Sequence, residues 1–237
     1  MSHGAPESKQ AKGRSRADTR DRLIDSAIGT LRSNGIAGTS ARTIAAAAGV
    51  NQALIFYHFG DMDALLAEAC RRTTERRVAR YRDRFATVGS LRDLLAAGRE
   101  IHAEERAEGN IAVLAQLLAA GQSDPVLGKV TADALALWVT EIEAVLTRLL
   151  RDSPLSEVVD PPSLSRVVSA AFIGLELYEG VDPEGGSTAL EALDQLGRLV
   201  ELVEELGPLA RRAVRSRIRR AKGEPSAGER RKEVPRS

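Results

Sequence analysis

The stretch from residue 39 to residue 59, TSARTIAAAAGVNQALIFYHF, constrains the fold more than any other part of the chain. Its first half places Ile44, Ala45 and Ala48 at the spacing of one helix face. Gly49 follows the last of these alanines, where a helix commonly ends in a left-handed residue. A second apolar set begins only a few residues later. The stretch therefore predicts two short helices joined by a tight turn, over residues 40–59.

Short polar side chains that can cap a helix lie at the expected start of each of these two helices. The hydroxyl of Thr39 or Ser40 can cap the first helix by accepting a backbone N–H, and Asn51 can cap the second. Val50 is the apolar residue of the turn. The inner face of the second helix is formed by Leu54, Ile55 and Phe59. The small alanines of the first helix would let the second pack closely across it.

The outer face of the second helix carries side chains of the kind that contact DNA in a major groove. Gln52 can bind adenine through two hydrogen bonds, and the methyl group of Ala53 can contact a thymine methyl. Arg42, on the first helix, could reach a guanine or a phosphate. An ordinary helical hairpin is the alternative interpretation of the same pattern. The candidate DNA-binding residues are Thr39, Ser40, Arg42, Thr43, Asn51, Gln52, Ala53, Phe56, Tyr57 and His58.

From about residue 16 to residue 77, the chain resembles the N-terminal domain of the TetR (AcrR-type) family of transcriptional regulators. The matching features are the segment AGTSARTIAAAAGVNQALIFYHFGDMDALL and the preceding helix RDRLIDSAIGTLRSNG, in the family's order and spacing. They cover about a quarter of the chain, and the aromatic cluster before the fourth helix makes the resemblance specific. The resemblance implies base contacts for Arg42, Gln52 and Ala53, and positions near phosphate for Thr39, Tyr57 and His58.

Three positions depart from the pattern of the family. Phe56 replaces the usual tyrosine, so it cannot donate a hydrogen bond to a phosphate or a base. Met62 stands where many members have a lysine that contacts the DNA backbone, and Leu54 replaces a common small or hydroxyl residue. Phe56 and Met62 keep a second hypothesis open, in which the chain is a small-molecule carrier or a partner-binding helical protein without sequence-specific DNA binding.

No strand-like alternation appears anywhere in the sequence, so we predict an all-α fold. Hydrophobic residues make up 43% of the chain and aromatic residues only 3%, which indicates an aliphatic, alanine-rich core. With the resemblance, this implies an N-terminal three-helix DNA-binding head and a C-terminal helical ligand-binding and dimerisation body, about nine helices in all. The expected helices span residues 19–34, 40–48, 51–59, 61–86, 90–106, 110–121, 125–151, 163–179 and 187–206.

The charge of the chain is strongly polarised along its length. Residues 1–22 carry a net charge of +3 and residues 211–237 carry +8, so the residues between them carry −10 within a total of +1. We expect a flexible basic arm over 1–16, the head over 17–77, the body over 78–206 and a basic extension over 207–237. The arm is either a solvated tail or a segment that follows phosphates or enters a minor groove. The extension is either solvated or binds DNA or an acidic partner non-specifically.

The resemblance also implies that the body binds a small molecule and forms a homodimer. The last two helices would pair with their mates across a two-fold axis, and the alternative is that they complete the core of a monomer. Two recognition helices so related would read a palindromic operator, with half-sites about 34–36 Å apart or a multiple of that. The protein would then be a ligand-responsive regulator, most often a repressor in this family.

The candidate residues for the effector pocket come from helices that we expect to converge. Each could equally be simple core. With one tryptophan and little charge expected inside the body, we predict an apolar or amphipathic effector. The candidate residues are His102, Leu114, Leu118, Trp138, Ile142 and Phe172.

The sequence offers no recognisable catalytic, cofactor or metal chemistry. Its three histidines are too sparse for a histidine-rich metal site, and no glycine-rich phosphate loop follows a predicted strand. Cys70 is the only cysteine, which we expect to be buried in a helix, and a redox-sensing role is the alternative. The polar N-terminus and the absence of a long apolar run predict a cytoplasmic protein without a membrane span. We therefore do not expect an enzyme.

Overall fold

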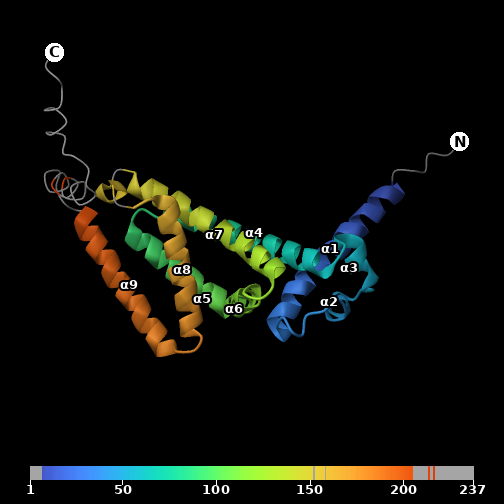
Figure 1. Ribbon diagram of the computed structural model, residues 1–237. Coiled ribbons are helices and arrows are strands. Elements are labelled where there is room, and N and C mark those ends of the chain that lie inside the picture. Colours follow the sequence, from blue (N-terminus) through green and yellow to red (C-terminus); the bar gives the residue numbers. More distant parts are fainter. Residues whose placement is uncertain (1–6, 152, 158, 205–212, 214–215, 217–237) are drawn as a thin grey trace, which may run out of the picture. The chain divides into compact units, whose positions relative to one another are not determined.

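The fold is described by a computed structural model that covers residues 7–151, 153–157, 159–204, 213 and 216 (Figure 1). Within these residues every regular element is helical, which confirms the all-α prediction. The α-helices are α1 (Glu7–Asn34), α2 (Ala41–Ala48), α3 (Ala53–Phe59), α4 (Met62–Thr87), α5 (Leu91–Ala107), α6 (Asn110–Gly121), α7 (Pro125–Leu150), α8 (Pro161–Glu179) and α9 (Pro183–Glu204), and a short 3-10 helix lies at Pro154–Glu157.

The described residues form two compact units. The first contains the chain up to Arg80 together with Glu104–Leu137, and the second contains Tyr81–Ala103 together with the described residues from Trp138 onward. Helices α4, α5 and α7 therefore contribute residues to both units. The first unit is larger than the continuous segment 17–77 that we expected for the head, because α6 and the start of α7 pack with the N-terminal helices.

The core of the first unit is built on one face of α1. The apolar stripe predicted for this helix is buried, and Leu23, Ile24 and Ala27 have no exposed surface. Side chains from α2, α3, α4, α6 and α7 complete the same core. Burial of each large aliphatic side chain stabilises the fold by about 1.5–3 kcal/mol relative to exposure. The other buried members are Ile28, Leu31, Ile44, Ala45, Ala48, Ile55, Leu65, Ala69, Cys70, Val113, Leu117 and Val130.

Helix α1 begins at Glu7, whereas we expected its start near residue 19 and a flexible arm over residues 1–16. The expectation of an arm is therefore wrong for residues 7–16, and residues 1–6 lie outside the described part. The physical reason is that this segment holds no proline and is rich in Lys, Arg, Gln and Ala. These residues extend a helix at little cost once the buried face downstream has nucleated it.

The start of α9 also differs from the expectation. We expected a loop over residues 180–186, but the helix begins at Pro183, four residues earlier than predicted. The carboxylate of Asp182 accepts a hydrogen bond from the Gly185 N–H at 3.0 Å, and proline suits the first turn. This start signal outweighs the cost of about 1 kcal/mol for each of the two glycines that follow. The basic extension predicted over 207–237 lies outside the described residues, apart from positions 213 and 216.

The second unit is built around α5. Tyr81, Phe85, Ile101 and Leu146 are among its buried core residues. Two glycines mark where helices approach closely: a Cβ on Gly98 would lie 2.5 Å from the ring of Phe172 in α8, and one on Gly197 in α9 would lie 2.8 Å from Leu95. Helices α8 and α9 lie side by side, joined by a short turn (Figure 1). Small residues thus allow α5 to contact both of the last helices.

Candidate functional site

The start of α2 is held by hydroxyl side chains, and one of them is a capping residue that the sequence predicted. Ser40 is the N-cap of α2, and its hydroxyl accepts a hydrogen bond from the Thr43 N–H at 3.2 Å. The Thr43 hydroxyl in return accepts one from the Ser40 N–H at 2.8 Å, which completes a capping box. Thr39 has a different role, because its hydroxyl donates to the Gly35 carbonyl at 2.7 Å. Of the two capping candidates, Ser40 is therefore the one used.

Gly49 ends α2 in the left-handed conformation, as predicted, with φ of +64°. The Val50 N–H donates to the Ala45 carbonyl at 3.0 Å and the Gly49 N–H donates to the Ala46 carbonyl at 3.1 Å. This pair of bonds is the Schellman motif, which satisfies the last carbonyls of a helix. The side chain of Val50 packs against the core of the first unit. The direction of the chain into α3 is thus fixed by backbone bonds and by one apolar contact.

Helix α3 presents one buried face and one exposed face. The N-cap position of α3 is Gln52, one residue later than we expected, and its side chain makes no capping bond. The Asn51 side-chain oxygen nevertheless accepts a hydrogen bond from the Ala53 N–H at 2.8 Å and so satisfies one donor of the first turn. Ile55 is completely buried, whereas Leu54 and Phe59 pack against the core while partly buried. Seven of the ten predicted DNA-binding residues are exposed: Ser40, Arg42, Asn51, Gln52, Ala53, Phe56 and Tyr57. Three of them, Ala53, Phe56 and Tyr57, lie on α3, which Ile55 anchors in the core.

Two arginines of α1 lie beside the aromatic end of α3. The guanidinium of Arg16 lies 5.0 Å from the ring centroid of Tyr57, and that of Arg20 lies 5.0 Å from that of Phe59. Such cation–π contacts stabilise by about 0.5–1 kcal/mol at exposed sites. Sequence analysis missed both contacts. The signal that could have found them is the spacing of the two arginines, which puts them on one face of the first helix.

The same arginines affect His58. Burial lowers the pKa of His58 below its ordinary value, and the charges of Arg16 and Arg20 lower this pKa further. The imidazole is therefore neutral at pH 7 and can offer one N–H donor and one acceptor, but no positive charge. Positive charge at this end of α3 comes instead from α1.

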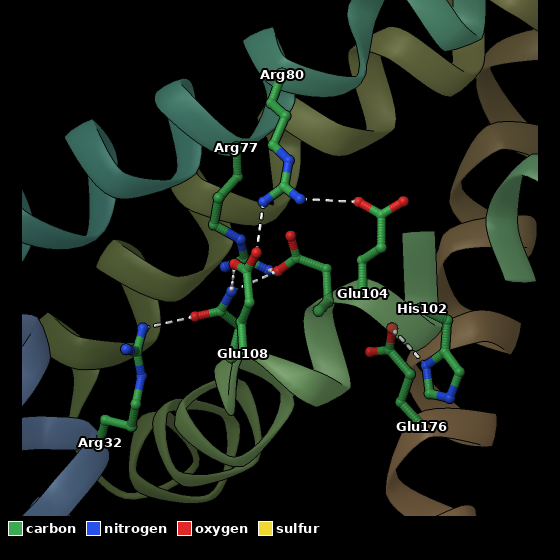
Figure 2. Close-up of polar contacts among 9 residues, drawn as sticks. Arg32, Arg77, Arg80, His102, Glu104, Glu108 and Glu176 are labelled. Carbon is green, nitrogen blue, oxygen red and sulfur yellow. Dashed lines mark hydrogen bonds and ion pairs between the residues drawn. The ribbon is translucent and has the colours of Figure 1, made fainter. Parts of the chain in front are cut away.

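A polar network holds α1, α4, α5 and α6 together inside the first unit (Figure 2). Arg77 of α4 pairs with Glu105, whose side chain is only 3% exposed. The Asn110 amide donates to Glu105 at 2.9 Å and accepts from Arg32, also at 2.9 Å. Arg80 pairs separately with Glu104 at 3.0 Å and with Glu108 at 2.5 Å. Arg32 joins the end of α1 to α6, Asn110 joins α6 to α5, and Arg77 joins α5 to α4, so the network links the four helices in series.

The residues predicted for an effector pocket divide between the two units. Leu114 and Leu118 belong to the first unit, and His102, Trp138, Ile142 and Phe172 belong to the second. Trp138 and Ile142 pack against the second core, where the Trp138 ring centroid lies 5.9 Å from that of Tyr81.

The second unit contains more buried charge than we expected. His102 Nδ1 lies 3.4 Å from a Glu176 oxygen (Figure 2). His102 Nε2 lies 2.5 Å from a Glu179 oxygen. The side chains of His102, Glu176 and Glu179 are 9%, 14% and 15% exposed. The expectation of little buried charge is therefore wrong. Sequence spacing could not predict this contact between α5 and α8, because His102 lies 74 and 77 residues before its two partners.

The His102 cluster predicts a pH-dependent stability. Hydrogen bonding to Glu176 and Glu179 outweighs the effect of burial and raises the pKa of His102. Its stabilising contribution is therefore complete below the unfolded-state pKa of about 6.5 and is lost as the pH rises through the higher folded-state pKa. Urea unfolding at a series of pH values should show this loss in the wild type and not in His102→Gln. His58→Gln is the control and should keep the loss, because the pKa of His58 is lowered instead; a wild-type pH profile in His102→Gln would contradict the prediction.

Three further observations limit the chemistry of the described residues. They hold no group of three or more His, Cys, Asp or Glu side chains that could bind a metal ion. No helix among them is both long enough and apolar enough to cross a membrane. Cys70 is buried as expected, and burial raises the pKa of its thiol to about 11, which keeps it protonated and unreactive at neutral pH.

Comparisons with known proteins agree with this geometry. Residues 23–69 match the sequence model of bacterial regulatory proteins of the tetR family. The chain is 25% identical, over 169 residues, to an uncharacterised HTH-type transcriptional regulator of Mycobacterium tuberculosis, covering 71% of this chain and 86% of the relative. A putative TetR-family regulator from Rhodococcus sp. superposes with a TM-score of 0.64 at 24% identity, covering 76% of this chain and 99% of that one.

A third comparison concerns a solved structure with a bound small molecule. The multidrug binding protein EbrR, crystallised with proflavin, superposes with a TM-score of 0.53 at 26% identity, covering 75% of this chain and 99% of that one. Together with the capped turn and exposed face of α3, the matches decide between the hypotheses drawn from the sequence. Residues 23–69 therefore match the DNA-binding domain of the tetR family, whose members are transcriptional regulators and not enzymes, and about three quarters of the chain is similar to helix-turn-helix transcriptional regulators.

Proposed function

We propose that the protein is a homodimeric, ligand-responsive regulator, and specifically a repressor, that binds a palindromic operator and is released or retuned by a small molecule. It would act in the cytoplasm, where its operator lies. The observation that carries the proposal is the presentation of Gln52 and Ala53. Both are exposed at the start of α3, while Ile55 of the same helix is fully buried in the core. A helix held in this way can enter a major groove without rearranging.

Recognition in this proposal divides between base contacts and phosphate contacts. Gln52 and Ala53 lie at the N-terminus of α3, the part of a recognition helix that contacts base edges. Arg42 is exposed on α2 and is suited to a guanine or a phosphate. Tyr57 is 62% exposed and can donate to a phosphate, whereas the exposed ring of Phe56 can offer only apolar contact. The capping hydroxyls of Ser40 and Thr43 would mainly hold the start of α2 in place.

Dimerisation is supported by apolar side chains left exposed on and just after α8. Val167, Leu177, Tyr178 and Val181 are 62%, 38%, 48% and 82% exposed. They recur at helical spacing, so they form a stripe along one side of α8. A two-fold related copy would cover this stripe and bring two recognition helices to two half-sites. Helices α8 and α9 thus remain our candidates for the dimer interface.

The effector is proposed to be amphipathic and to bind in the second unit near His102, Trp138, Ile142 and Phe172. The buried His102 cluster would orient its polar end, and the neighbouring aromatic and aliphatic side chains would contact the rest. The likeness to EbrR, which was crystallised with proflavin, supports an amphipathic compound. To change operator occupancy from 99:1 to 1:99, the effector must prefer one state by about 5.5 kcal/mol. Fluorescence of Trp138, the only tryptophan, would report its binding.

Replacing Gln52 by alanine tests the base-reading role. We expect Gln52→Ala to lose about 1–3 kcal/mol of discrimination at one or two base pairs, with a nearly unchanged salt dependence. Competition binding against operators varied at each position measures this. Tyr57→Phe is the matched control and should weaken binding equally on all sequences, because phosphate contacts carry no sequence information. A loss of affinity in Gln52→Ala that is the same on every operator would show that Gln52 does not read bases.

A further inference from the structure

The end of α1 is closed by a side chain from α6. Gly35 follows α1 in the left-handed conformation, with φ of +70°, and its N–H donates to the Leu31 carbonyl at 3.0 Å. The next amide, that of Ile36, donates to the side-chain oxygen of Gln116 in α6 at 3.1 Å. At Gly49, in contrast, the amide that follows the glycine donates back to the helix that has just ended. The cap of α1 is therefore completed by a residue outside the helix-turn-helix.

Resting on the DNA-binding function proposed above, we propose that Gln116 is a positioning residue for operator recognition. Its side chain holds the turn over residues 35–39 and, through that turn, the start of α2. Gln116 lies outside the segment 23–69 that matches the tetR family. The proposal therefore adds to the DNA-binding part of the chain a residue that the family match does not include.

Helix α6 is fixed against the end of α1 by apolar and polar contacts. Val113 and Leu117, one helical turn apart, are buried in the core of the first unit, and Ile36 packs against the same core. At the start of α6, the Asn110 side-chain oxygen accepts a hydrogen bond from Arg32 of α1 at 2.9 Å. The oxygen that closes the cap of α1 is thus offered by a helix that is itself held in place.

Hydrogen bonds continue from Ile36 to the start of α2. The Ile36 carbonyl accepts from the Thr39 N–H at 3.0 Å, and the Thr39 hydroxyl donates to the Gly35 carbonyl at 2.7 Å. The turn that these bonds close leads directly into the capping box of Ser40 and Thr43, which starts α2. Every bond in this series joins residues no more than four apart in sequence, except the first, which comes from α6.

The series ends at residues that face DNA in the proposed function. Arg42 is exposed on α2 and lies between the two residues of the capping box. If the Ile36 N–H loses its acceptor, a half-buried donor is left unsatisfied and the native turn is less favoured. Only the molecules that keep the native turn then present Arg42 correctly, so the apparent affinity for the operator falls in proportion to their fraction.

Substitutions of Gln116 can separate its hydrogen bond from the rest of its side chain. Gln116→Met removes the accepting oxygen but keeps a long unbranched side chain, whereas Gln116→Glu keeps an acceptor. Gln122→Met is the matched control, because Gln122 is exposed just after the same helix and its amide lies 3.5 Å from the Leu118 carbonyl. Glutamine, methionine and glutamate have similar helix propensities, so α6 should stay intact, which circular dichroism would verify.

The experiment uses the full chain and an operator selected by the wild type from a pool of randomised duplexes. Gln116→Met should bind this operator about tenfold more weakly, a factor that corresponds to about 1.4 kcal/mol. Gln116→Glu and Gln122→Met should keep the wild-type affinity. Binding is measured well below the unfolding temperature, so that a loss of global stability alone would leave the dissociation constant unchanged.

Amide hydrogen exchange gives a second readout that does not depend on DNA. The N–H groups of Ile36 and Thr39 should be protected in the wild type and should exchange faster in Gln116→Met, because the turn opens more often. The Val50 N–H, which closes the other end of α2, is the internal control and should keep its protection.

The outcomes separate this proposal from the function on which it rests. If the wild type selects an operator but Gln116→Met binds it with wild-type affinity, Gln116 does not position α2. The same conclusion follows if Gln116→Glu loses as much affinity as Gln116→Met, since the accepting oxygen would then not be the cause. An unprotected Ile36 amide in the wild type overturns the proposal even if the methionine variant fails to fold. If the wild type selects no sequence at all, the proposed function fails and the proposal fails with it.

Discussion

Replacing Arg77 by alanine is expected to lower the free energy of unfolding by about 3–5 kcal/mol. The partner of Arg77 is Glu105, whose side chain is 3% exposed, so the substitution removes the counter-charge of Arg77 from a carboxylate in the interior. The destabilisation comes from this lost counter-charge, because a buried ion needs both its counter-charge and its hydrogen bonds. Urea unfolding followed by circular dichroism measures the change.

Arg76→Ala is the control for this prediction. Arg76 is the preceding residue of α4, and it pairs with Asp25 at 3.0 Å where both side chains are more than half exposed. An exposed pair of this kind contributes about 0–1 kcal/mol. The double variant Arg77→Met/Glu105→Gln removes both charges but keeps an acceptor for Asn110, and it should recover more than half of the loss. If Arg77→Ala costs no more than Arg76→Ala, Glu105 is not a buried charge that depends on Arg77.

Replacing Ile55 by alanine is expected to cost about 2–5 kcal/mol of stability. Ile55 is fully buried and is the main apolar anchor of α3 in the core of the first unit, so the change leaves a cavity beneath the recognition helix. DNA binding should weaken on every sequence, because the whole helix loses its support. Chemical unfolding and operator binding, measured on the same preparation, test both effects.

Phe56→Ala is the control that removes an exposed side chain of α3 instead of its buried anchor. Phe56 is the next residue of α3 but is 48% exposed, so its removal should change stability by about 0.5 kcal/mol or less. If Ile55→Ala is as stable as Phe56→Ala, α3 is not held by this anchor. The rigid presentation of Gln52 and Ala53 would then lose its physical basis.

The helix-turn-helix could be predicted because its determinants are local. Ser40 bonds to Thr43 and Asn51 bonds to Ala53, which lie only two or three residues apart, and Gly49 acts through its own backbone. Capping residues, a left-handed glycine and a 3.6-residue period are all visible in one short stretch of sequence. The apolar stripe of α1 that includes Leu23 could be predicted for the same reason. The residue at which α1 begins could not.

The features that sequence reasoning missed depend on long-range packing. Arg32 and Asn110 are 78 residues apart, and His102 and Glu179 are 77 apart. Both pairs form only when helices that are distant in sequence lie side by side, which no local pattern specifies. The early start of α1 was missed for another reason: a polar, basic composition indicates exposure to solvent, but it does not by itself exclude a helix.

The alternative hypothesis of a carrier without DNA binding rested on Phe56 and Met62, and Leu54 was a third departure from the pattern of the family. Leu54 and Met62 pack against the core of the first unit, so both have a structural role in this chain. Arg16 and Arg20 supply positive charge beside α3 from a different helix. Positive charge beside α3 therefore does not depend on the residues at positions 56 and 62.

Operator binding by the purified protein tests the central claim most directly. Fluorescence anisotropy would compare DNA that flanks its own gene with a scrambled duplex, at two salt concentrations. The account predicts tight binding to one palindrome, saturating at an even number of protomers, with weaker binding to the scrambled duplex that is more easily abolished by salt. Equal, weak and salt-sensitive binding to both duplexes, repeated with other neighbouring promoters, would contradict it and leave only non-specific contact by the basic segments.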